Sequence, residues 1–538
     1  MKVNSRVGYF AAFTAVFAVC SAYVFWGTWS AAVAPVMPDN AITHPEAYSE
    51  ILRACWSKFV SSGRFVPSDV LWDGLFVSPY FCQELKYVSA LYFSGLALAY
   101  FLSGRGLKPL AAYGAGLLLS FCGYWSTLFS AGHAGWFCWM TYGVFAFGLI
   151  DRALAHGKLR HWMLLGLVIA WGMFYQPDLW LMFTIFTAAY FLYRIVLART
   201  FPWKGMLAAA VVFFAVGAPA IRNAIGEVGS REKQIDATRP AAEATGKPLD
   251  DRESRWIFVT NWSLPPDEIA EFFVPSLNGD TSCPLTLSLG AQAGTGVKPY
   301  TGAIGRPYKA AGGNYRQHSV YVGWVTCLLC LVGILSFKTN RREIGFFAVA
   351  AVFCCLLSLG RYFEPLYRCV FALPVGDLVR CPVKWHHLTE FSMTVLAGYG
   401  INWLLTARRF ENAKWLLPAV AAAVVFGAFD LAGEAHRFCA PVDMHEARRQ
   451  DASFQMTFLP KRQFSDPQVA SMVRSRRVVS LGYYPGRDDV YLVGVLNPRA
   501  GEKPAPLPDF GAPTALGIVS VLSSLAVIGC CLRSLKRS

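Results

Sequence analysis

The chain has 538 residues, of which 55% are apolar and only 15% are charged, and its formal net charge is +15. A single soluble core stops growing at about 250 to 300 residues, and so few charges cannot cover a soluble protein of this size. The composition also excludes disordered, collagen-like and small disulfide-rich chains. The basic residues form short clusters between apolar runs, which favours a membrane protein over one that binds nucleic acid.

Twelve apolar segments approach the length of about 20 residues that crosses the hydrocarbon core of a bilayer. They are residues 8–30, 87–102, 110–128, 136–154, 161–175, 178–197, 205–221, 319–337, 344–359, 388–406, 415–431 and 513–532. The two short segments on either side of Pro177 are also consistent with one helical hairpin or a re-entrant pair. We predict an all-α, multi-pass membrane protein with about twelve transmembrane helices.

Basic residues indicate the orientation of these helices. If the segments alternate in direction, the following clusters all fall on one side: Lys2/Arg6, Arg105/Lys108, Arg152/Lys158/Arg160, Arg194/Arg199/Lys204, Lys338/Arg341/Arg342, Arg408/Arg409/Lys414 and Arg533/Lys536/Arg537. Cytoplasmic loops are enriched in Lys and Arg, so both termini are predicted to be cytoplasmic. The first segment is also consistent with a signal peptide ending at Ala32-Val33-Ala34, but its length favours an uncleaved helix.

This topology divides the chain into five regions. They are an N-terminal transmembrane core at residues 1–221 with a first outer loop at 31–86, an extracytoplasmic region at 222–318, a second transmembrane block at 319–433, a small extracytoplasmic segment at 434–512, and a last helix with a basic tail at 513–538. Within the small segment, residues 477–484 and 489–496 are typical of two strands, and the Pro-Gly turn between them predicts a β-hairpin.

The first outer loop contains Asp39, between the end of the first apolar segment and residues 48–60. Apolar residues at helical spacing in residues 48–60 predict an amphipathic helix that lies flat on the outer membrane surface. Asp39 is therefore expected where a carboxylate meets both water and lipid headgroups. It is either a turn or capping residue, or a general base that deprotonates an acceptor hydroxyl.

Two more polar residues lie at the outer boundary. His133 stands among small residues that allow close backbone approach to a ligand, although a packing or capping histidine fits the same pattern. Asp178 opens a predicted helix, where an N-cap role explains an aspartate without any further function. Cysteines on the outer side can form disulfides in an oxidising compartment, and Cys55–Cys82 and Cys369–Cys381 are the nearest pairs in sequence.

The loop between residues 360 and 387 departs from the charge rule, because it is short and outer but carries Arg361, Arg368, Arg380 and Lys384. Positive charge held at this depth favours an anion such as a phosphate or diphosphate headgroup. Contact with anionic lipids, or ion pairs with acidic residues elsewhere, explains the same charges. His386 and His387 are adjacent and are expected to point in different directions, which argues against one chelating site.

Several of these residues belong to short motifs that resemble a known family. They are Asp39, Gly132-His133, Asn261-Trp262-Ser263-Leu264-Pro265-Pro266-Asp267-Glu268, Val274-Pro275, Gly279, Tyr321-Val322-Gly323 and Arg380-Cys381-Pro382-Val383-Lys384. Over about residues 1–435 the arrangement resembles the bacterial YfhO-type membrane proteins, within the GT-C class of glycosyltransferases that use lipid phosphosugars. GT-C enzymes usually have an acidic pair in the first outer loop, whereas here Asp39 is followed by Asn40.

The resemblance implies an inverting transferase that moves a sugar from a polyprenyl-phosphate carrier to an extracytoplasmic glycan, lipid or protein acceptor. It makes Asp39 the base and Arg380 and Lys384 the phosphate contacts. His133 would orient the donor or the acceptor, and Asp178 and His387 complete the candidate substrate-binding residues. No cofactor is predicted, and a divalent metal stays open.

Two other functions remain alternatives. One is a transporter or flippase for a lipid-linked substrate, although we find no internal repeat of the kind that transporters often contain. The other is an envelope assembly protein whose catalytic site has decayed. Asn40, which stands where GT-C enzymes usually have a second acidic residue, keeps this alternative open. Membrane lipids are expected partners in every case, and nucleic acid in none. Convergence of Asp39, His133 and Arg380 on one outward cavity would favour the enzyme.

Overall fold

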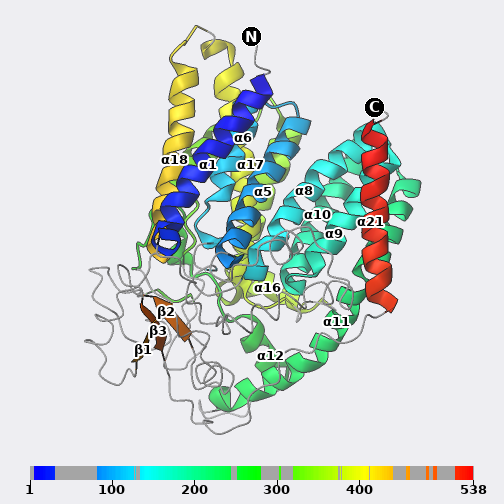
Figure 1. Ribbon diagram of the computed structural model, residues 1–538, viewed down its shortest axis with the longest axis vertical. Helices are drawn as coiled ribbons and strands as arrows, with labels where there is room; N and C mark the ends of the chain where they lie inside the picture. Colours follow the sequence, from blue (N-terminus) through cyan, green and yellow to red (C-terminus); the bar gives the residue numbers. More distant parts are fainter. Residues whose placement is uncertain are drawn as a thin grey trace.

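The chain folds into a bundle of long apolar helices with smaller elements gathered at one end (Figure 1). This computed structural model describes residues 5–30, 82–125, 128, 134–243, 251–279, 302–304, 319–373, 376, 379–410, 412–439, 456–460, 480–483, 489–493 and 515–536. The first helix begins and the last helix ends at the same end of the bundle, which we call the terminus end (Figure 1). The opposite end, where the smaller elements lie, is the loop end.

A helix is present at each of the twelve predicted segments. The helices are α1 (Ser5–Ser30), α5 (Cys82–Gly104), α6 (Pro109–Ser120), α8 (Ala134–His156), α9 (Leu159–Met173), α10 (Pro177–Ala198), α11 (Trp203–Glu243), α14 (Trp324–Leu335), α15 (Arg341–Ser358), α17 (His386–Thr406), α18 (Leu416–Cys439) and α21 (Ala515–Lys536).

Six of these helices, α1, α5, α10, α11, α18 and α21, are long and apolar enough to cross a membrane. A seventh is added if α15 and the short helix that follows it are counted as one bent span. These apolar helices support the prediction of a helical membrane protein, while the count of twelve spanning helices stays a prediction.

Short elements cluster at the loop end. They are α12 (Asp251–Val259), η1 (Pro266–Phe272), η2 (Gly360–Phe363), α16 (Glu364–Phe371) and η4 (Pro382–Trp385). A further short turn of helix, η5 (Arg408–Phe410), joins α17 to α18. These elements lie on segments that the sequence analysis assigned to outer loops, apart from η5.

Two of the predicted spans are shorter than expected. The segments 110–128 and 319–337 were predicted as continuous helices, but α6 ends at Ser120 and α14 begins at Trp324. Each helix has 12 residues, which reach about 18 Å, well short of the ~30 Å hydrocarbon core. Residues 121–123 after α6 and residues 319–323 before α14 are non-helical backbone at the loop end, and Gly323 takes a positive φ of 94° there, a conformation that glycine adopts without strain.

Close helix packing depends on small residues, as is usual between membrane helices. A Cβ placed on Gly116 of α6 would lie 2.3 Å from the carbonyl oxygen of Gly95 in α5. In the same way, a Cβ on Gly400 of α17 would lie 2.1 Å from the carbonyl oxygen of Leu329 in α14. Larger side chains at these positions would push the helices apart.

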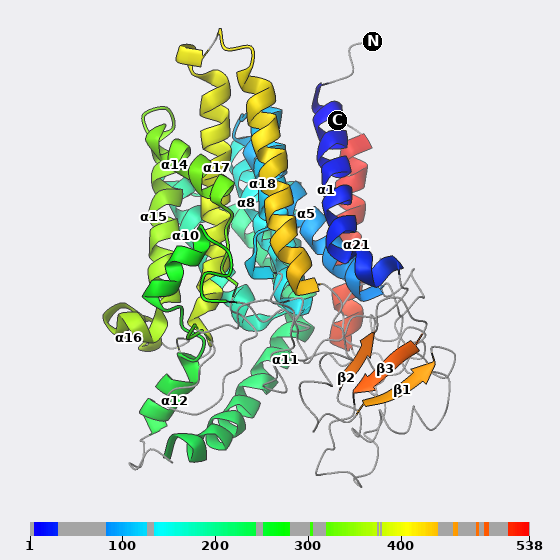
Figure 2. The same ribbon diagram turned by 90° about the vertical axis from the view of Figure 1, so that its left-hand side faces the viewer.

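The strands that the structure describes form a small antiparallel sheet in the order β1-β3-β2 (Figure 2). Strand β2 (Ser480–Tyr483) pairs with β3 (Asp489–Val493), which lies where the hairpin was predicted. Strand β1 (Met456–Pro460) pairs with the other edge of β3 and was not anticipated from the sequence.

Candidate functional site at the loop end

The loop end brings together motifs that are far apart in the sequence. The segment after α12 runs beside the Arg380–Lys384 motif, because the backbone N–H of Cys381 donates to the Val259 carbonyl at 3.0 Å. The N–H of Val383 likewise donates to the Trp262 carbonyl at 3.0 Å. Two of the segments that carry the family resemblance are therefore neighbours in space.

A third motif joins them through the shortened helices. The N–H of Val322 donates to the Phe272 carbonyl at 3.2 Å, and the N–H of Gly123 donates to the Tyr321 carbonyl at 2.7 Å. The non-helical ends of α6 and α14 thus lie against each other and against η1. Irregular backbone at membrane depth is tolerated where protein surrounds it, and these mutual hydrogen bonds satisfy it here.

At the centre of this region, Lys384 of η4 forms an ion pair with Asp178 in the first turn of α10. The two side chains are only 2% and 4% exposed. Asp178 is not the helix cap that one interpretation of the sequence gave it, since Gln176 occupies that position. Its second oxygen accepts a hydrogen bond from the Leu179 N–H at 2.9 Å. The positive charge of Lys384 is therefore neutralised within the protein.

Arg380 is placed differently, although it is only four residues from Lys384. Its guanidinium carbon lies 4.8 Å from the ring centre of Phe258 and 5.3 Å from that of Trp262. Its Nε donates a hydrogen bond to the Cys381 sulfur at 3.4 Å. In the described part of the chain, no carboxylate forms an ion pair with this half-buried guanidinium. Aromatic contact of this kind fixes an arginine while leaving donors for an anion.

The loop that carries Arg380 is held in place by α16. The Tyr367 hydroxyl donates a hydrogen bond to the Val379 carbonyl at 3.4 Å. Burial raises the pKa of Tyr367, so the hydroxyl keeps its proton and remains a donor. Arg380 is thus positioned by backbone contacts with the α12 segment on one side and by α16 on the other.

Glu390, in the second turn of α17, was missed by the sequence analysis. Its Oε1 accepts the Tyr124 N–H at 3.2 Å and lies 3.6 Å from His386 Nε2, and its Oε2 lies 3.7 Å from His387 Nδ1. His386 Nε2 is also 3.0 Å from the Val320 carbonyl oxygen. The two histidines precede Glu390 by four and three residues, spacings that place both on one side of a helix.

The adjacent histidines were expected to point in different directions, but both rings approach the same carboxylate. A structural role explains much of this cluster: Glu390 accepts from the Tyr124 N–H, just after the break that ends α6, and His386 contacts the non-helical backbone before α14. The sequence signal was available as an acidic residue inside an apolar span, which is rare and usually has a partner.

Other predicted features fall outside the described residues or are not formed. Asp39, His133 and the 48–60 helix lie outside the described residues, so their roles stay predictions. The proposed Cys369–Cys381 disulfide is wrong, since both cysteines are free. Cys369 is exposed on α16 and Cys381 is buried beside Arg380, so the local fold turns the two thiols into different surroundings. Cys55 of the other proposed pair is likewise outside the described residues.

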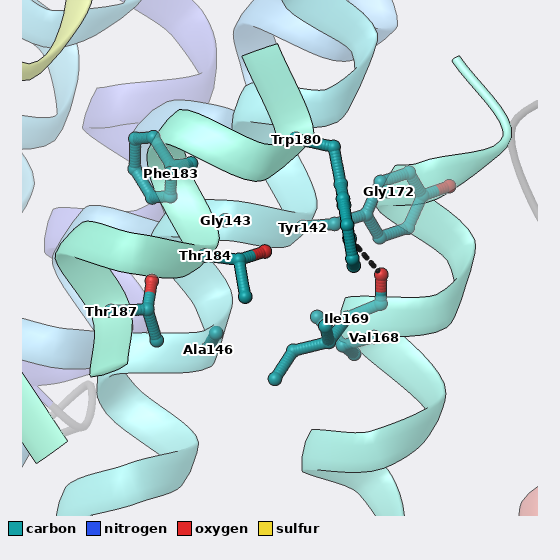
Figure 3. A pocket seen from close by; sticks show the side chains of 10 residues that line it. All are labelled: Tyr142, Gly143, Ala146, Val168, Ile169, Gly172, Trp180, Phe183, Thr184 and Thr187. Atoms are coloured by element: carbon teal, nitrogen blue, oxygen red, sulfur yellow. Dashed lines mark hydrogen bonds between the residues drawn. The ribbon is translucent and has the colours of Figure 1, made fainter. Parts of the chain in front are cut away.

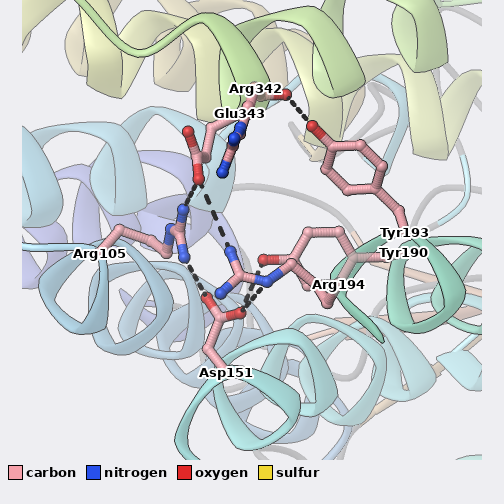
Figure 4. Close-up of polar contacts among 7 residues, drawn as sticks. All are labelled: Arg105, Asp151, Tyr190, Tyr193, Arg194, Arg342 and Glu343. Atoms are coloured by element: carbon pink, nitrogen blue, oxygen red, sulfur yellow. Dashed lines mark hydrogen bonds and ion pairs between the residues drawn. The ribbon is translucent and has the colours of Figure 1, made fainter. Parts of the chain in front are cut away.

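A second charged cluster is formed by side chains of Arg105, Asp151, Arg194 and Glu343 (Figure 4). Arg105, in the turn after α5, pairs with Glu343 of α15 and lies 3.5 Å from Asp151 of α8. Arg194 of α10 contacts the same two carboxylates at 3.3 and 3.7 Å, and the Tyr190 hydroxyl donates to Asp151 at 3.0 Å. The two cations and two carboxylates balance in charge, and their contacts join α8, α10, α15 and the turn after α5.

A small cavity between α8, α9 and α10 has a volume of about 20 Å³ (Figure 3). Gly143, Gly172 and Thr184 are among the residues that line it, and the Trp180 indole donates to the Ile169 carbonyl at 2.8 Å beside it. This volume holds about one water molecule. It is too small for a sugar ring, so the cavity is a packing defect between helices rather than a substrate site.

No group of three His, Cys, Asp or Glu side chains is placed to hold a metal ion among the residues that the structure describes. Comparison with known proteins found no family model, no curated protein and no solved structure that matches the chain.

Proposed function

We propose that this chain is a GT-C-type glycosyltransferase that uses a polyprenyl-phosphate-linked sugar. The proposal includes the topology predicted from the sequence: about twelve membrane spans, cytoplasmic termini and a loop end on the outer face of a bacterial inner membrane. It rests on the resemblance of the motifs at the loop end and on the positive-inside distribution of Lys and Arg. The start of α1 and the end of α21 at one side of the bundle are consistent with it (Figure 1).

The single observation that supports the activity most strongly is the difference between Arg380 and Lys384. Lys384 is paired with Asp178, whereas Arg380 lies against the rings of Phe258 and Trp262 and has no carboxylate within ion-pair distance in the described part of the chain. Asp178 acts on Arg380 only from farther away. An arginine held in this way offers a planar pair of donors, which suits a phosphate oxygen. We therefore assign the carrier phosphate to Arg380 and give Lys384 the role of positioning η4 against α10.

In the proposed reaction, Asp39 takes the proton from the acceptor hydroxyl as its oxygen attacks the anomeric carbon. The bond from that carbon to the phosphate oxygen breaks at the same time, with inversion of configuration. Negative charge then develops on the departing lipid phosphate, and the Arg380 guanidinium stabilises it. Electrostatic stabilisation of developing charge in a partly dry site is a large contribution in many enzymes. A covalent glycosyl-enzyme would need a second, closely placed carboxylate.

A graded substitution at Arg380 tests this assignment. Lys at this position keeps the charge but loses the planar donor pair, and Ala loses both, so carrier affinity should fall from wild type to Arg380→Lys to Arg380→Ala. The Ala variant should lose about 2–5 kcal/mol of binding free energy for the phosphorylated carrier, and nothing for the neutral prenyl alcohol.

Arg368 provides the matched control, because it also stacks on an aromatic ring, Trp256 at 4.1 Å, but is paired with Glu364. Arg368→Ala should leave carrier affinity unchanged. Equal losses for carrier and alcohol in Arg380→Ala would mean that this arginine only holds its loop in place.

A transporter of a lipid-linked substrate is the second candidate. It is favoured by the buried charge pairs at both ends of α10, where Asp178 pairs with Lys384 and Arg194 with Asp151. Contacts of this kind can break alternately when helices rock during transport. A transporter would move the labelled carrier across the bilayer with its sugar still attached, whereas the enzyme would separate the two.

A further inference from the structure

We propose that η2 and α16 together form an interfacial helix that rests in the headgroup layer of the membrane leaflet at the loop end. Its partner is the lipid bilayer surface itself. The inference does not depend on glycosyl transfer, since a transporter with the same fold would carry the same element.

The direction of the chain is the first ground. Between α15 and the η2–α16 segment the axis bends by 107°, although the two are separated by a single residue, Leu359. Figure 2 shows α16 projecting sideways from the bundle, level with the end of α15. A helix that leaves an apolar bundle sideways at this level runs along a membrane surface rather than across it.

The burial pattern of α16 is the second ground. Its inner face packs on α12, because Tyr367 is fully buried and its ring centre lies 6.1 Å from that of Trp256. The open side of the η2–α16 segment carries large apolar side chains at both of its ends: Tyr362 and Phe363 of η2 are 39% and 38% exposed, and Leu373, two residues after α16, is 55% exposed. A helix facing only water would present polar residues there. Aromatic and aliphatic side chains on an open face are typical of the zone between headgroups and acyl chains.

Continuity with the lipid-facing side of α15 is the third ground. On that helix Val349 is 69% exposed and Val352 is 62% exposed, as expected for side chains that contact acyl chains. Tyr362 and Phe363 follow the end of α15 after three intervening residues, so exposed apolar side chains are present on both sides of the bend. The one charged residue at the corner, Arg361, lies with its guanidinium carbon 5.2 Å from the Tyr362 ring centre, as expected for an arginine at the boundary between apolar groups and headgroups.

The charges on the segment fit the same location. Arg368 donates to Glu364 at 3.0 Å, one turn earlier in the helix, and both side chains remain close to half exposed. Arginine can bury its stem among apolar groups while its guanidinium stays in the headgroup layer. An ion pair at the edge of an apolar face is therefore compatible with shallow insertion and not with a span across the bilayer.

Photolabelling of the unmodified full chain tests the inference in vesicles of phosphatidylethanolamine and phosphatidylglycerol. One sample contains a lipid with a diazirine near its headgroup, and the other a water-soluble diazirine. Trypsin cuts after Arg342, Arg361, Arg368 and Arg380. The lipid probe should therefore report on residues 362–368 and 369–380, with residues 343–361 of α15 as the internal lipid-facing control.

We expect label per residue from the lipid probe on the η2–α16 peptides within about twofold of that on the α15 peptide. The water-soluble probe should label them less than it labels Asp267, an exposed residue of η1. Strong labelling by the water-soluble probe alone would show that the segment stands clear of the bilayer. Labelling by neither probe would show that protein covers it. Either result overturns the proposal.

Discussion

Removing the charge of Lys384 should destabilise the protein far more than the loss of one side chain would suggest. Its ammonium group and the Asp178 carboxylate are both almost completely buried, so Lys384→Met leaves a carboxylate without its cation. Breaking a buried pair at one partner costs about 3–5 kcal/mol, whereas removing both partners is often neutral. Lys384→Met and Asp178→Asn should each lower the free energy of unfolding by about that amount, and the double variant by less than either.

The assay is steric trapping in bicelles, which measures the free energy of unfolding of a membrane protein under native conditions. Arg368→Met and Glu364→Gln form the matched control, because that pair is 44% and 45% exposed. Its coupling energy should be only about 0.3–0.5 kcal/mol, as for other exposed helix pairs. If both buried single variants lose less than about 1 kcal/mol and their effects add, the ion pair is not the unit that joins η4 to α10.

Two further predictions follow from packing and from charge. Gly116→Ala should lower the free energy of unfolding by about 1–3 kcal/mol, because the new Cβ would meet the Gly95 carbonyl. Gly433 has open space around it, so Gly433→Ala should leave the free energy of unfolding unchanged or slightly higher. Equal effects of the two variants in the bicelle assay would argue against close packing of α5 and α6. A cysteine placed at residue 246 should react with a membrane-impermeant thiol reagent in intact cells, and one at Lys338 should not; the reverse pattern would invert the proposed topology.

Helix positions were predictable from the sequence because apolar length alone determines where a segment can be buried in lipid. The prediction was wrong where a local tertiary contact replaced helical hydrogen bonds. At Gly123 the backbone bonds to Tyr321 instead of continuing α6, and at Gly323 the backbone conformation changes before α14 begins. Hydropathy is the same for a helical residue and for an extended one packed against its neighbour, so this signal cannot separate the two.

The candidate site was predictable only in part, for a related reason. Arg380 and Lys384 were found together because both are basic residues in an outer loop, but charge counting cannot tell which of them has a partner. Asp178 lies more than 200 residues earlier, and only the fold brings it to Lys384. The Arg105 network was missed for the same reason, since its four charged residues are distributed over four separate elements.

The most direct test of the central claim is the fate of the sugar in proteoliposomes that contain the purified chain, a polyprenyl-phosphate carrier with a labelled sugar, and an acceptor. We predict that wild-type protein transfers the sugar to the acceptor with inversion at the anomeric carbon. Asp39→Asn should reduce this rate by about 100-fold or more, as expected for loss of a general base, while the protein stays folded. Turnover that Asp39→Asn leaves unchanged would remove Asp39 from the reaction. Intact labelled carrier on the opposite leaflet, with no sugar transferred, would contradict the account and identify a transporter.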